Sequence, residues 1–540
     1  MYRPLLLCVA FSIAACNGTD TEKQISLFCD TLNAVNAGSI NTDGSPELNG
    51  HVLILKTLLG NAPPSLKKDL RRIHDTVDAW ASAISGDRPM IKIFAVLTAP
   101  ELVGSEGRVT DFVAVHCGID LGGKPWKEAQ RPSAQSICPA WPRVGTPATF
   151  NNFPNLPDIA GSNYFANDFV ISKAAAMLGI NKLQGAFVVE PGGKVEIHGQ
   201  YPRARYFAYH PNDMDLNNLP TLRDKDLNPD EGSINPFREL PSQESKNYYT
   251  ATLVFSAPPA NPAPNTRYVG VRKDGSTKNN FVVNLLRMYH VDAGNRPGSG
   301  EVPLPAVTIY KANGEVDKQF AECDLFAPGN EELKTDMVFP ALPIIDHRPR
   351  NPPQWTTSSN FDAPSDTMAN ADVQYLATHY SQRFGELLVT RAKYLSAPNT
   401  RAGEPHSAPD KDVRLYNLCT YNFWNGGAIQ CLLENDLRVD AAGFYTLVVS
   451  SEKNQPKNLM ATHATWLDWG PYLDGQLQFR FVYRENPYVA AIAKAANRQD
   501  IANELLPYVP AAVPCDASTY ENGGWQACFI KSKKDITPYL

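Results

Sequence analysis

The stretch Leu477-Gln-Phe-Arg-Phe-Val-Tyr483 decides the fold of the C-terminal region, because large apolar side chains occupy every second position. The apolar or aromatic set is Leu477, Phe479, Phe481 and Tyr483, and it alternates with Gln478, Arg480 and Val482. Successive side chains of a β-strand point to opposite faces. The period of two therefore predicts a strand with one face in a core.

The same signals recur from about residue 120 onward. Pro191-Gly-Gly-Lys194 separates two short β-like runs and predicts a hairpin with Val195 and Ile197 on one face. Further strands are expected at residues 205–209, 252–256, 281–290, 306–310, 387–391, 414–419 and 445–450. Many short antiparallel strands with turn signals between them indicate a sandwich or barrel, and we see no repeat of short period.

The N-terminal region has a different period. Leu66, Leu70, Ile73 and Val77 are spaced by three and four residues, which predicts one apolar helix face. The expected fold class is α+β, with a small N-terminal helical bundle followed by a large antiparallel, jelly-roll-like β-sandwich region. We expect a helical domain at 26–120, a first β half at 121–345, a Pro-rich linker at 346–372, and a second β half at 373–540 that ends in a disulfide-closed loop.

The first residues of the chain predict its cellular location. Arg3 precedes a short apolar run, and Ile13-Ala-Ala-Cys16 matches a bacterial lipobox. We expect a signal peptide at 1–15, lipidation at Cys16 and a polar tether at 16–25. The alternative is an ordinary secretory signal that contains a cysteine by accident. The lipobox predicts an extracytoplasmic protein with a lipid anchor in the cell envelope, and Asn17 favours the outer membrane or cell surface.

The composition of the chain limits the kinds of binding partner that we expect. Hydrophobic residues make up 43% of the chain and charged residues 20%, which is typical of a globular protein. The net charge is -6 and no basic block is present, so nucleic acid is not an expected partner.

Eight cysteines remain in the mature chain, and an even count in an oxidising compartment predicts four disulfides. They are Cys29, Cys117, Cys138, Cys323, Cys419, Cys431, Cys515 and Cys528. Locality favours Cys419–Cys431 and Cys515–Cys528. Cys29–Cys117 would bracket the helical region, and Cys138–Cys323 follows by elimination. The alternative is that one or two of these thiols are free and buried.

An acidic run is the first candidate site. Asp224, Asp226, Asn228 and Asp230 place oxygen ligands on alternate residues, which is a pattern that can bind calcium, although the Gly and Glu of an EF-hand are absent. Asp213 belongs to a shorter run of the same kind. The alternatives are a polar surface turn or a set of catalytic carboxylates. No other cofactor is expected.

The strand before this run is the second candidate. Arg203 and Arg205 lie beside aromatic residues and can hold a carboxylate or sulfate, or form ion pairs with the acidic run. His210 follows them, and the strand histidines His198, His210 and His290 can converge as metal ligands. The alternative for His290 is a partly buried strand residue.

Aromatic loops near the C-terminus are the third candidate. Trp424, Trp466 with Asp468, Trp469, Tyr472 and Trp525 lie in segments rich in Gly, Asn and Pro. Exposed aromatic rings beside Asp and Asn can stack on a sugar and hydrogen-bond its edges. The alternative is that these rings close the open ends of the sandwich.

The same C-terminal segments support a resemblance. Asp440-Ala-Ala-Gly-Phe-Tyr-Thr-Leu-Val-Val-Ser450, Ala464-Thr-Trp-Leu467 and Asp474-Gly-Gln-Leu-Gln-Phe-Arg-Phe-Val-Tyr483 resemble the end of bacterial domains of unknown function of the 1254/1214 type. Gly199 to Tyr209 is similar to an upstream strand of that family. Thr465 and Asp468-Trp469 depart from its pattern. The resemblance implies a jelly-roll-like sandwich and no assigned activity.

Two function classes follow. The first is a lipid-anchored protein that binds a glycan or another envelope component. The second is an extracytoplasmic hydrolase or lyase that uses Asp, His and Arg at one end of the sandwich. The chain lacks a Gly-x-Ser-x-Gly elbow, a phosphate-binding Gly-rich loop and a zincin motif, which favours the binding protein.

Overall fold

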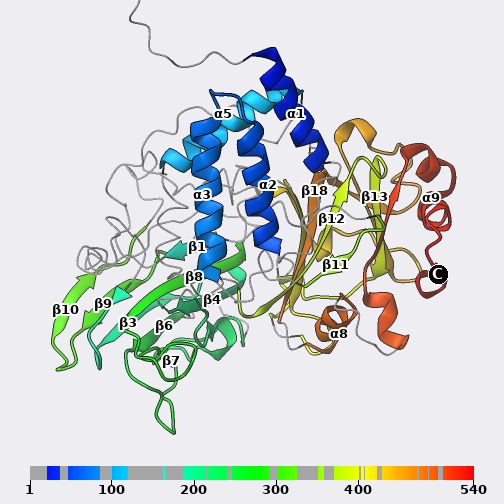
Figure 1. Ribbon diagram of the computed structural model, residues 1–540. Helices are drawn as coiled ribbons and strands as arrows, with labels where there is room; N and C mark the ends of the chain where they lie inside the picture. Colours follow the sequence, from blue (N-terminus) through cyan, green and yellow to red (C-terminus); the bar gives the residue numbers. More distant parts are fainter. Residues whose placement is uncertain are drawn as a thin grey trace, which may run out of the picture.

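The computed structural model describes residues 21–36, 47–84, 100–118, 162–165, 187–213, 217–239, 246–291, 301–324, 351–357, 370–400, 403–406, 408–422, 428–470, 474–483, 486–496 and 503–540. These residues form an α+β protein, as predicted. In Figure 1 the N-terminal helices (blue) lie above the first group of sheets (green) and beside the second (yellow to red).

The described part of the N-terminal bundle contains four helices: α1 (Glu22–Asn36), α2 (Glu47–Asn61), α3 (Lys67–Ile84) and α5 (Pro100–Cys117). The predicted face of Leu66, Leu70, Ile73 and Val77 is buried in their common core. Asp69 on α3 accepts a hydrogen bond from Arg108 on α5 at 2.6 Å. The bundle therefore combines an apolar core with a polar contact between helices.

The first group of strands forms two sheets that share one core. One sheet has the order β1 (Ser162–Phe165), β8 (Phe281–Val291), β4 (Ala204–Asn212) and β5 (Leu222–Arg223), with β2 (Phe187–Val188) also paired to β8. The other has the order β10 (Val316–Phe320), β9 (Ala306–Tyr310), β3 (Lys194–Gln200), β6 (Tyr248–Val254) and β7 (Thr266–Tyr268). Val195 and Ile197 lie together in the core between the two sheets.

The second group repeats this layering. One sheet has the order β11 (Trp355–Thr356), β12 (Val373–Ser381), β18 (Asp474–Val482), β14 (Leu415–Asn422) and β15 (Ala428–Leu433). The other has the order β17 (Ala464–Asp468), β16 (Phe444–Ser450), β13 (Leu387–Lys393) and β19 (Ala511–Cys515). The helices α8 (Pro487–Ala496) and α9 (Ala517–Lys531) complete this part of the chain.

The alternation in β18 is confirmed up to the end of the strand. Leu477, Phe479 and Phe481 lie in the core of the second sandwich. Tyr483 does not join them, because β18 ends at Val482 and the period of two applies only within the strand. Its hydroxyl instead donates a hydrogen bond to Asp224 of the first sandwich at 2.7 Å.

The two sandwiches share one strand order, which corrects the expectation of a single jelly-roll. The series β8-β4-β5 and β9-β3-β6-β7 correspond to β18-β14-β15 and β19-β13-β16-β17. In both, the last pair named, β6–β7 or β16–β17, is parallel, and the other strand pairs of the described residues are antiparallel. This is a repeat of whole domains, far longer than a solenoid period.

The outer faces of two of these sheets pack together, and we call this contact the seam. Tyr206, Ala208 and Tyr289 from β4 and β8 contact Val373, Leu415 and Val482 from β12, β14 and β18. The expected linker at 346–372 is not a simple spacer. Its residues form strand β11 and supply Asn370 and Asp372, which are buried at the seam.

Three expected disulfides are formed: Cys419–Cys431 and Cys515–Cys528, which locality favoured, and Cys29–Cys117, which brackets the helical region. Cys323 is also disulfide-bonded, while its expected partner Cys138 lies outside the described residues, as does Cys16. Disulfides suit an oxidising, extracytoplasmic compartment. None of the helices in the described ranges is long and apolar enough to cross a membrane.

Candidate functional site

The acidic run does not form the expected calcium loop. Asp224 is fully buried, Asn228 accepts a hydrogen bond from Arg238 at 3.0 Å, and Asp230 accepts one from Thr250 at 3.2 Å. Asp226 is exposed. Across the described ranges, no group of three or more His, Cys, Asp or Glu side chains is placed to hold a metal ion. Asp224, Asn228 and Asp230 thus serve separate contacts, and the chain turns through a 3-10 helix at Asp224–Asp226.

The candidate arginines have different partners from those expected. Arg203 is an exposed residue that pairs with Glu301 at 2.9 Å. Arg205 is 1% exposed and pairs with Glu434 of the second sandwich. Asp213 is buried and accepts backbone hydrogen bonds from Asn217 and Lys273, both at 3.0 Å. Neither arginine pairs with the acidic run: Arg203 finds its partner within the first sandwich, and the docking of the sandwiches brings Glu434 to Arg205.

The expected histidine cluster lies on two different sheets. His210 on β4 is completely buried, whereas His198 on β3 is exposed and lies 3.3 Å from Asp230. The side chain of His290 lies outside the described residues. Burial lowers the pKa of His210 well below its usual value, and the nearby charges of Arg287 and Arg223 lower it further.

The described aromatic rings of these loops pack into the cores of the second sandwich. Trp469 is 1% exposed and packs on Tyr380, with ring centroids 3.9 Å apart. Trp525 is buried, and the half-buried Trp466 donates a hydrogen bond to Ser450 at 2.9 Å. The carboxylate of Asp468 accepts a hydrogen bond from Gly470 at 2.8 Å. Trp424 and Tyr472 lie outside the described residues, so the expected exposed platform is not formed by the rings that are described.

The seam is instead held by an exchange of arginines between equivalent positions. The backbone N–H of Phe207 donates to Asp224 at 3.4 Å, and that of Tyr416 donates to Glu434 at 3.4 Å. These two carboxylates therefore occupy equivalent places in the two sandwiches. The arginines two residues before each donor are Arg205 and Arg414.

Each arginine of this pair reaches the carboxylate of the other sandwich. Arg205 pairs with Glu434, and Arg414 lies 3.5 Å from Asp224. Arg414 also donates to the backbone carbonyl of Arg205 at 2.5 Å. Burial raises the pKa of Asp224 and of Glu434, and each arginine opposes that rise for its own partner.

Two tyrosine–aspartate contacts add to the exchange. Tyr206 of the first sandwich donates to Asp372 of the second at 2.7 Å, and Tyr483 of the second donates to Asp224 of the first at 2.7 Å. Arg223 pairs with Asp372 at 2.7 Å. Burial raises the pKa of Asp372, against the effect of Arg223 and Tyr206.

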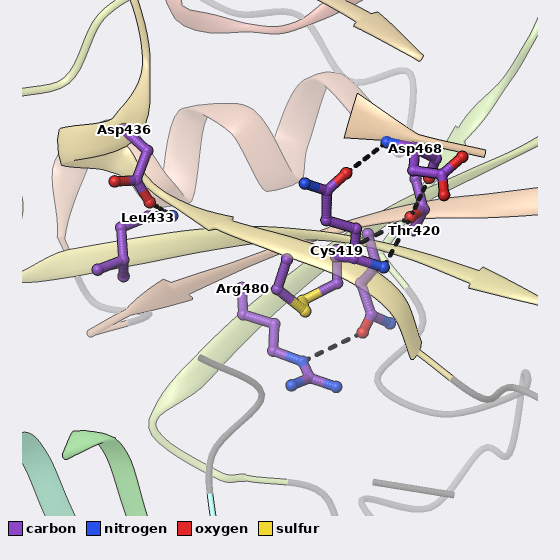
Figure 2. The surroundings of a disulfide bond; sticks show 9 residues. Cys419, Thr420, Leu433, Asp436, Asp468 and Arg480 are labelled. Atoms are coloured by element: carbon purple, nitrogen blue, oxygen red, sulfur yellow. Dashed lines mark hydrogen bonds between the residues drawn. A yellow bond between two sulfur atoms is a disulfide. The ribbon is translucent and has the colours of Figure 1, made fainter. Parts of the chain in front are cut away.

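A cluster of tyrosines and arginines lies beside these contacts, and we call it the Arg480 cluster: Arg287, Tyr289, Tyr375, Tyr421 and Arg480. Arg480 on β18 is paired in register with Tyr375 on β12. Its guanidinium lies 5.9 Å from the ring centroid of Tyr375 and 5.6 Å from that of Tyr421 on β14. Figure 2 shows Arg480 on the same side of the sheet as the disulfide of Cys419.

The electrostatics of this cluster are set by burial. Tyr375 and Tyr421 are 5% and 7% exposed, and burial raises the pKa of both phenols, so both are neutral at pH 7. Burial lowers the pKa of Arg480, but the neighbouring side chains of Tyr421, Tyr289 and Tyr375 together raise it above its usual value. The cluster therefore presents cationic guanidinium groups between neutral hydroxyl groups.

Sequence reasoning missed this cluster although part of its signal was visible. Arg480 stands between Phe479 and Phe481, so the alternation assigns it to the non-core face of the strand. A polar strand face normally contacts solvent. Its partial burial beside Tyr289 depends on the docking of the other sandwich, which no local pattern predicts.

One acid-sensitive contact at the seam allows a prediction. The Nδ1 atom of His406 accepts a hydrogen bond from Arg414 at 2.9 Å, which requires a neutral imidazole. Burial, followed by the charges of Arg414 and Arg205, lowers the pKa of His406 to about 3. The stability that depends on neutral His406 is thus present above pH 6.5 and is lost as the pH falls toward 3.

We therefore expect His406→Gln to flatten the acid dependence of stability. Below pH 6.5 each pH unit costs the native protein about 1.4 kcal/mol through this histidine, or about 2 kcal/mol at pH 5. Glutamine retains a hydrogen-bond acceptor and does not titrate. Urea denaturation at pH 5, 6, 7 and 8 measures the difference, and the two proteins should run parallel between pH 7 and 8. Equal slopes below pH 6.5 would contradict the assignment.

Comparisons with known proteins identify no family. No protein-family model matches the chain, and no curated protein matches it. The crystal structures that match include an uncharacterised protein from Burkholderia cenocepacia, with 14% identity, a TM-score of 0.37 and coverage of 86% of this chain and 95% of that one. They also include a Vibrio parahaemolyticus protein, with 12% identity, a TM-score of 0.29 and coverage of 55% of this chain and 82% of that one.

Proposed function

We propose that this chain is a lipid-anchored, extracytoplasmic binding protein, and that the Arg480 cluster holds a glycan or another envelope component. The lipobox at Cys16 supports the anchor, and the disulfides are consistent with the compartment. The ligand-binding part of the proposal depends on one observation, which concerns the hydroxyl group of Tyr421.

The hydroxyl of Tyr421 is buried beside Arg480 and has no hydrogen-bond partner in the structure as described. A buried polar group without a partner costs about 1–3 kcal/mol. Such a group calls for an explanation, and a bound ligand is one. Tyrosine rings offer apolar faces to a sugar ring, while their hydroxyls and Arg480 offer donors to its oxygens.

The enzyme alternative has a weaker basis. Its best support is a chain of hydrogen bonds in which Tyr206 contacts Asp372 at 2.7 Å and His210 at 3.1 Å. All three side chains are buried, at 0% to 1% exposure, and join the two sandwiches. We therefore place the ligand at the Arg480 cluster, where Arg480 itself is only partly buried.

Tyr421→Phe tests this proposal because it removes one hydroxyl and retains the ring. We expect affinity for a ligand found on an envelope-glycan array to fall about tenfold, equivalent to about 1.4 kcal/mol. Isothermal titration calorimetry on the purified protein provides the measurement.

Tyr380→Phe is the matched control. Tyr380 is buried on β12, and its hydroxyl likewise has no hydrogen-bond partner in the described structure, but it lies in the core of the second sandwich. Its replacement should leave affinity unchanged. If both variants bind as the parent does, or if no glycan on the array binds, the proposal is wrong.

A further inference from the structure

The repeat makes the end of β3 in the first sandwich equivalent to the end of β13 in the second. The ladder between β3 and β6 ends with Gln200 opposite Tyr248, and the ladder between β13 and β16 ends with Lys393 opposite Phe444. In each sandwich the backbone carbonyl of that aromatic residue accepts a hydrogen bond from the N–H of an aspartate, at 2.9 Å in the first and 2.8 Å in the second. Tyr248 and Phe444 therefore occupy equivalent places.

Two residues before these ladder ends, His198 on β3 corresponds to Arg391 on β13. Each of these basic side chains contacts that same aspartate and a threonine of its own sandwich. The distances are 3.3 and 3.2 Å from Nδ1 of His198 to Asp230 and Thr250, and 2.7 and 2.9 Å from Arg391 to Asp440 and Thr446. The ring centroids of His198 and Tyr248 lie 5.6 Å apart, and the guanidinium of Arg391 lies 4.8 Å from the ring centroid of Phe444. The same set of contacts is thus built twice.

The two copies differ in what covers the basic side chain. Arg391 lies 4.2 Å from the ring centroid of Trp525 on α9 and donates to the backbone carbonyl of Tyr539 at 2.9 Å. Its side chain is 5% exposed, whereas that of His198 is 49% exposed. The second sandwich thus shows what this place accepts, which is a flat ring over the basic group together with a hydrogen-bonding oxygen. In the first sandwich the same place is open.

The sheet face around each place decides which kind of ring fits it. Around Arg391 the face is apolar and packs with Trp525 in one cluster; its side chains are Leu387, Val389, Val448 and Val513. The same ladder positions around His198 hold polar side chains: Lys194, Glu196, Thr252 and Thr308. An apolar helix would bury these polar groups without partners, whereas a sugar offers them hydroxyl groups. The first sandwich therefore suits a ring that carries hydroxyl groups.

The charges on this face are paired with one another. Lys194 lies 2.5 Å from Glu196, and Nδ1 of His198 lies 3.3 Å from Asp230. A charged ligand would compete with these pairs, whereas a neutral ligand leaves them in place. We therefore expect the occupant to be uncharged.

The imidazole of His198 also favours a hydroxyl group. The carboxylate of Asp230 only accepts hydrogen bonds, so Nδ1 carries the proton and Nε2 of the neutral ring is an acceptor. A sugar hydroxyl can donate to such an acceptor, which a peptide carbonyl cannot do. The apolar face of a pyranose can at the same time stack on the rings of His198 and Tyr248, which are parallel to within 7°.

We infer that the outer face of the first sandwich is a second binding site, in which a neutral sugar ring of a glycan lies over His198 and Tyr248, in the place that Trp525 takes over Arg391. This site lies on a different sandwich from the Arg480 cluster. It goes beyond the proposed function and does not depend on it.

Calorimetry on the full protein tests this site with uncharged cello-, chito-, malto- and xylo-oligosaccharides. We expect at least one of them to bind with a dissociation constant below about 1 mM. For that sugar, His198→Ala and Tyr248→Ala should each weaken binding about tenfold. Tyr248→Phe keeps the ring and reproduces Phe444 of the other copy, so its affinity should stay within about threefold of the parent's.

Two control variants locate the binding. His116→Ala removes another exposed histidine whose ring lies beside an aromatic ring, 4.3 Å from that of Phe112 on α5, and should leave affinity unchanged. Tyr421→Phe alters the Arg480 cluster and should also leave it unchanged. His198 is exposed, so His198→Ala should keep the parent's melting temperature and decides the case if Tyr248→Ala melts lower.

The possible outcomes separate the two sites. Unchanged affinity in His198→Ala, or failure of all four kinds of sugar to bind, overturns this inference. Weaker binding in Tyr421→Phe alone overturns it as well, but supports the proposed function at the Arg480 cluster. Weaker binding in His198→Ala with unchanged binding in Tyr421→Phe is the expected result, whichever way the proposed function is decided.

Discussion

Replacing Arg205 with Met is expected to lower the free energy of unfolding by about 3–5 kcal/mol, because it leaves the carboxylate of Glu434 buried without its cation. Glu434 is 0% exposed, and Arg205 also donates to the carbonyl of Pro398 at 2.6 Å. Breaking a buried pair from one side is costly since the remaining charge cannot reach water. Chemical denaturation of the purified protein measures this loss.

Two control variants distinguish the effect of breaking the Arg205–Glu434 pair from the effect of losing an arginine in general. Arg203→Ala, two residues earlier, removes an exposed partner of Glu301 and should cost about 1 kcal/mol or less. The double variant Arg205→Met with Glu434→Leu removes both charges and should recover most of the stability. A double variant as unstable as Arg205→Met alone would contradict the assignment of the loss to an uncompensated Glu434.

Replacing Arg391 with Met is expected to destabilise the second sandwich by a similar amount, about 3–5 kcal/mol. Arg391 is 4% exposed and donates to Asp440 at 2.7 Å, to Thr446 at 2.9 Å and to the carbonyl of Tyr539 at 2.9 Å. Its guanidinium also lies 4.2 Å from the ring centroid of Trp525 on α9. One side chain thus joins β13 to the C-terminal helix and the last residues of the chain.

The loss should be visible locally as well as globally. Hydrogen exchange should speed up in α9 and near Tyr539 before it does in the first sandwich. Lys531→Ala is the matched control, since Lys531 at the end of α9 forms an exposed ion pair with Asp516, the residue before that helix, and should contribute about 1 kcal/mol or less. Unchanged exchange in α9 of Arg391→Met would show that Arg391 does not hold the helix.

The repeat was visible in the sequence only as a short match. Leu222-Arg-Asp-Lys-Asp-Leu227 and Leu432-Leu-Glu-Asn-Asp-Leu437 both place an acid first in a 3-10 helix between two leucines. The acids of this match, Asp224 and Glu434, are the two that exchange arginines across the seam. The spacing of acids in the first loop predicts a metal ligand at Asp224, because the composition of the loop suits both a metal site and an ion pair.

Local sequence patterns predicted the structure correctly where residues close together in the chain determine it. The period of two in Leu477–Phe481 and the helical period of Leu66–Val77 identify buried faces, since side-chain direction follows directly from backbone geometry. The spacing of Cys419 with Cys431 and of Cys515 with Cys528 pointed to their disulfides, because short loops close most readily.

Tertiary structure alone decided which polar groups meet. Arg205 lies beside Glu434, and Asp224 lies beside Tyr483. Arg480 lies beside the rings of Tyr375 and Tyr421. From the sequence alone, each of these charged residues is expected to be solvated. Coulombic attraction and hydrogen bonding act through space, and their partners are set by the docking of two whole sandwiches. The sequence by itself indicated the α+β class, the buried faces of its periodic segments and three disulfides. The candidate site exists because the docking of two sandwiches brought polar strand faces together and reduced their contact with water.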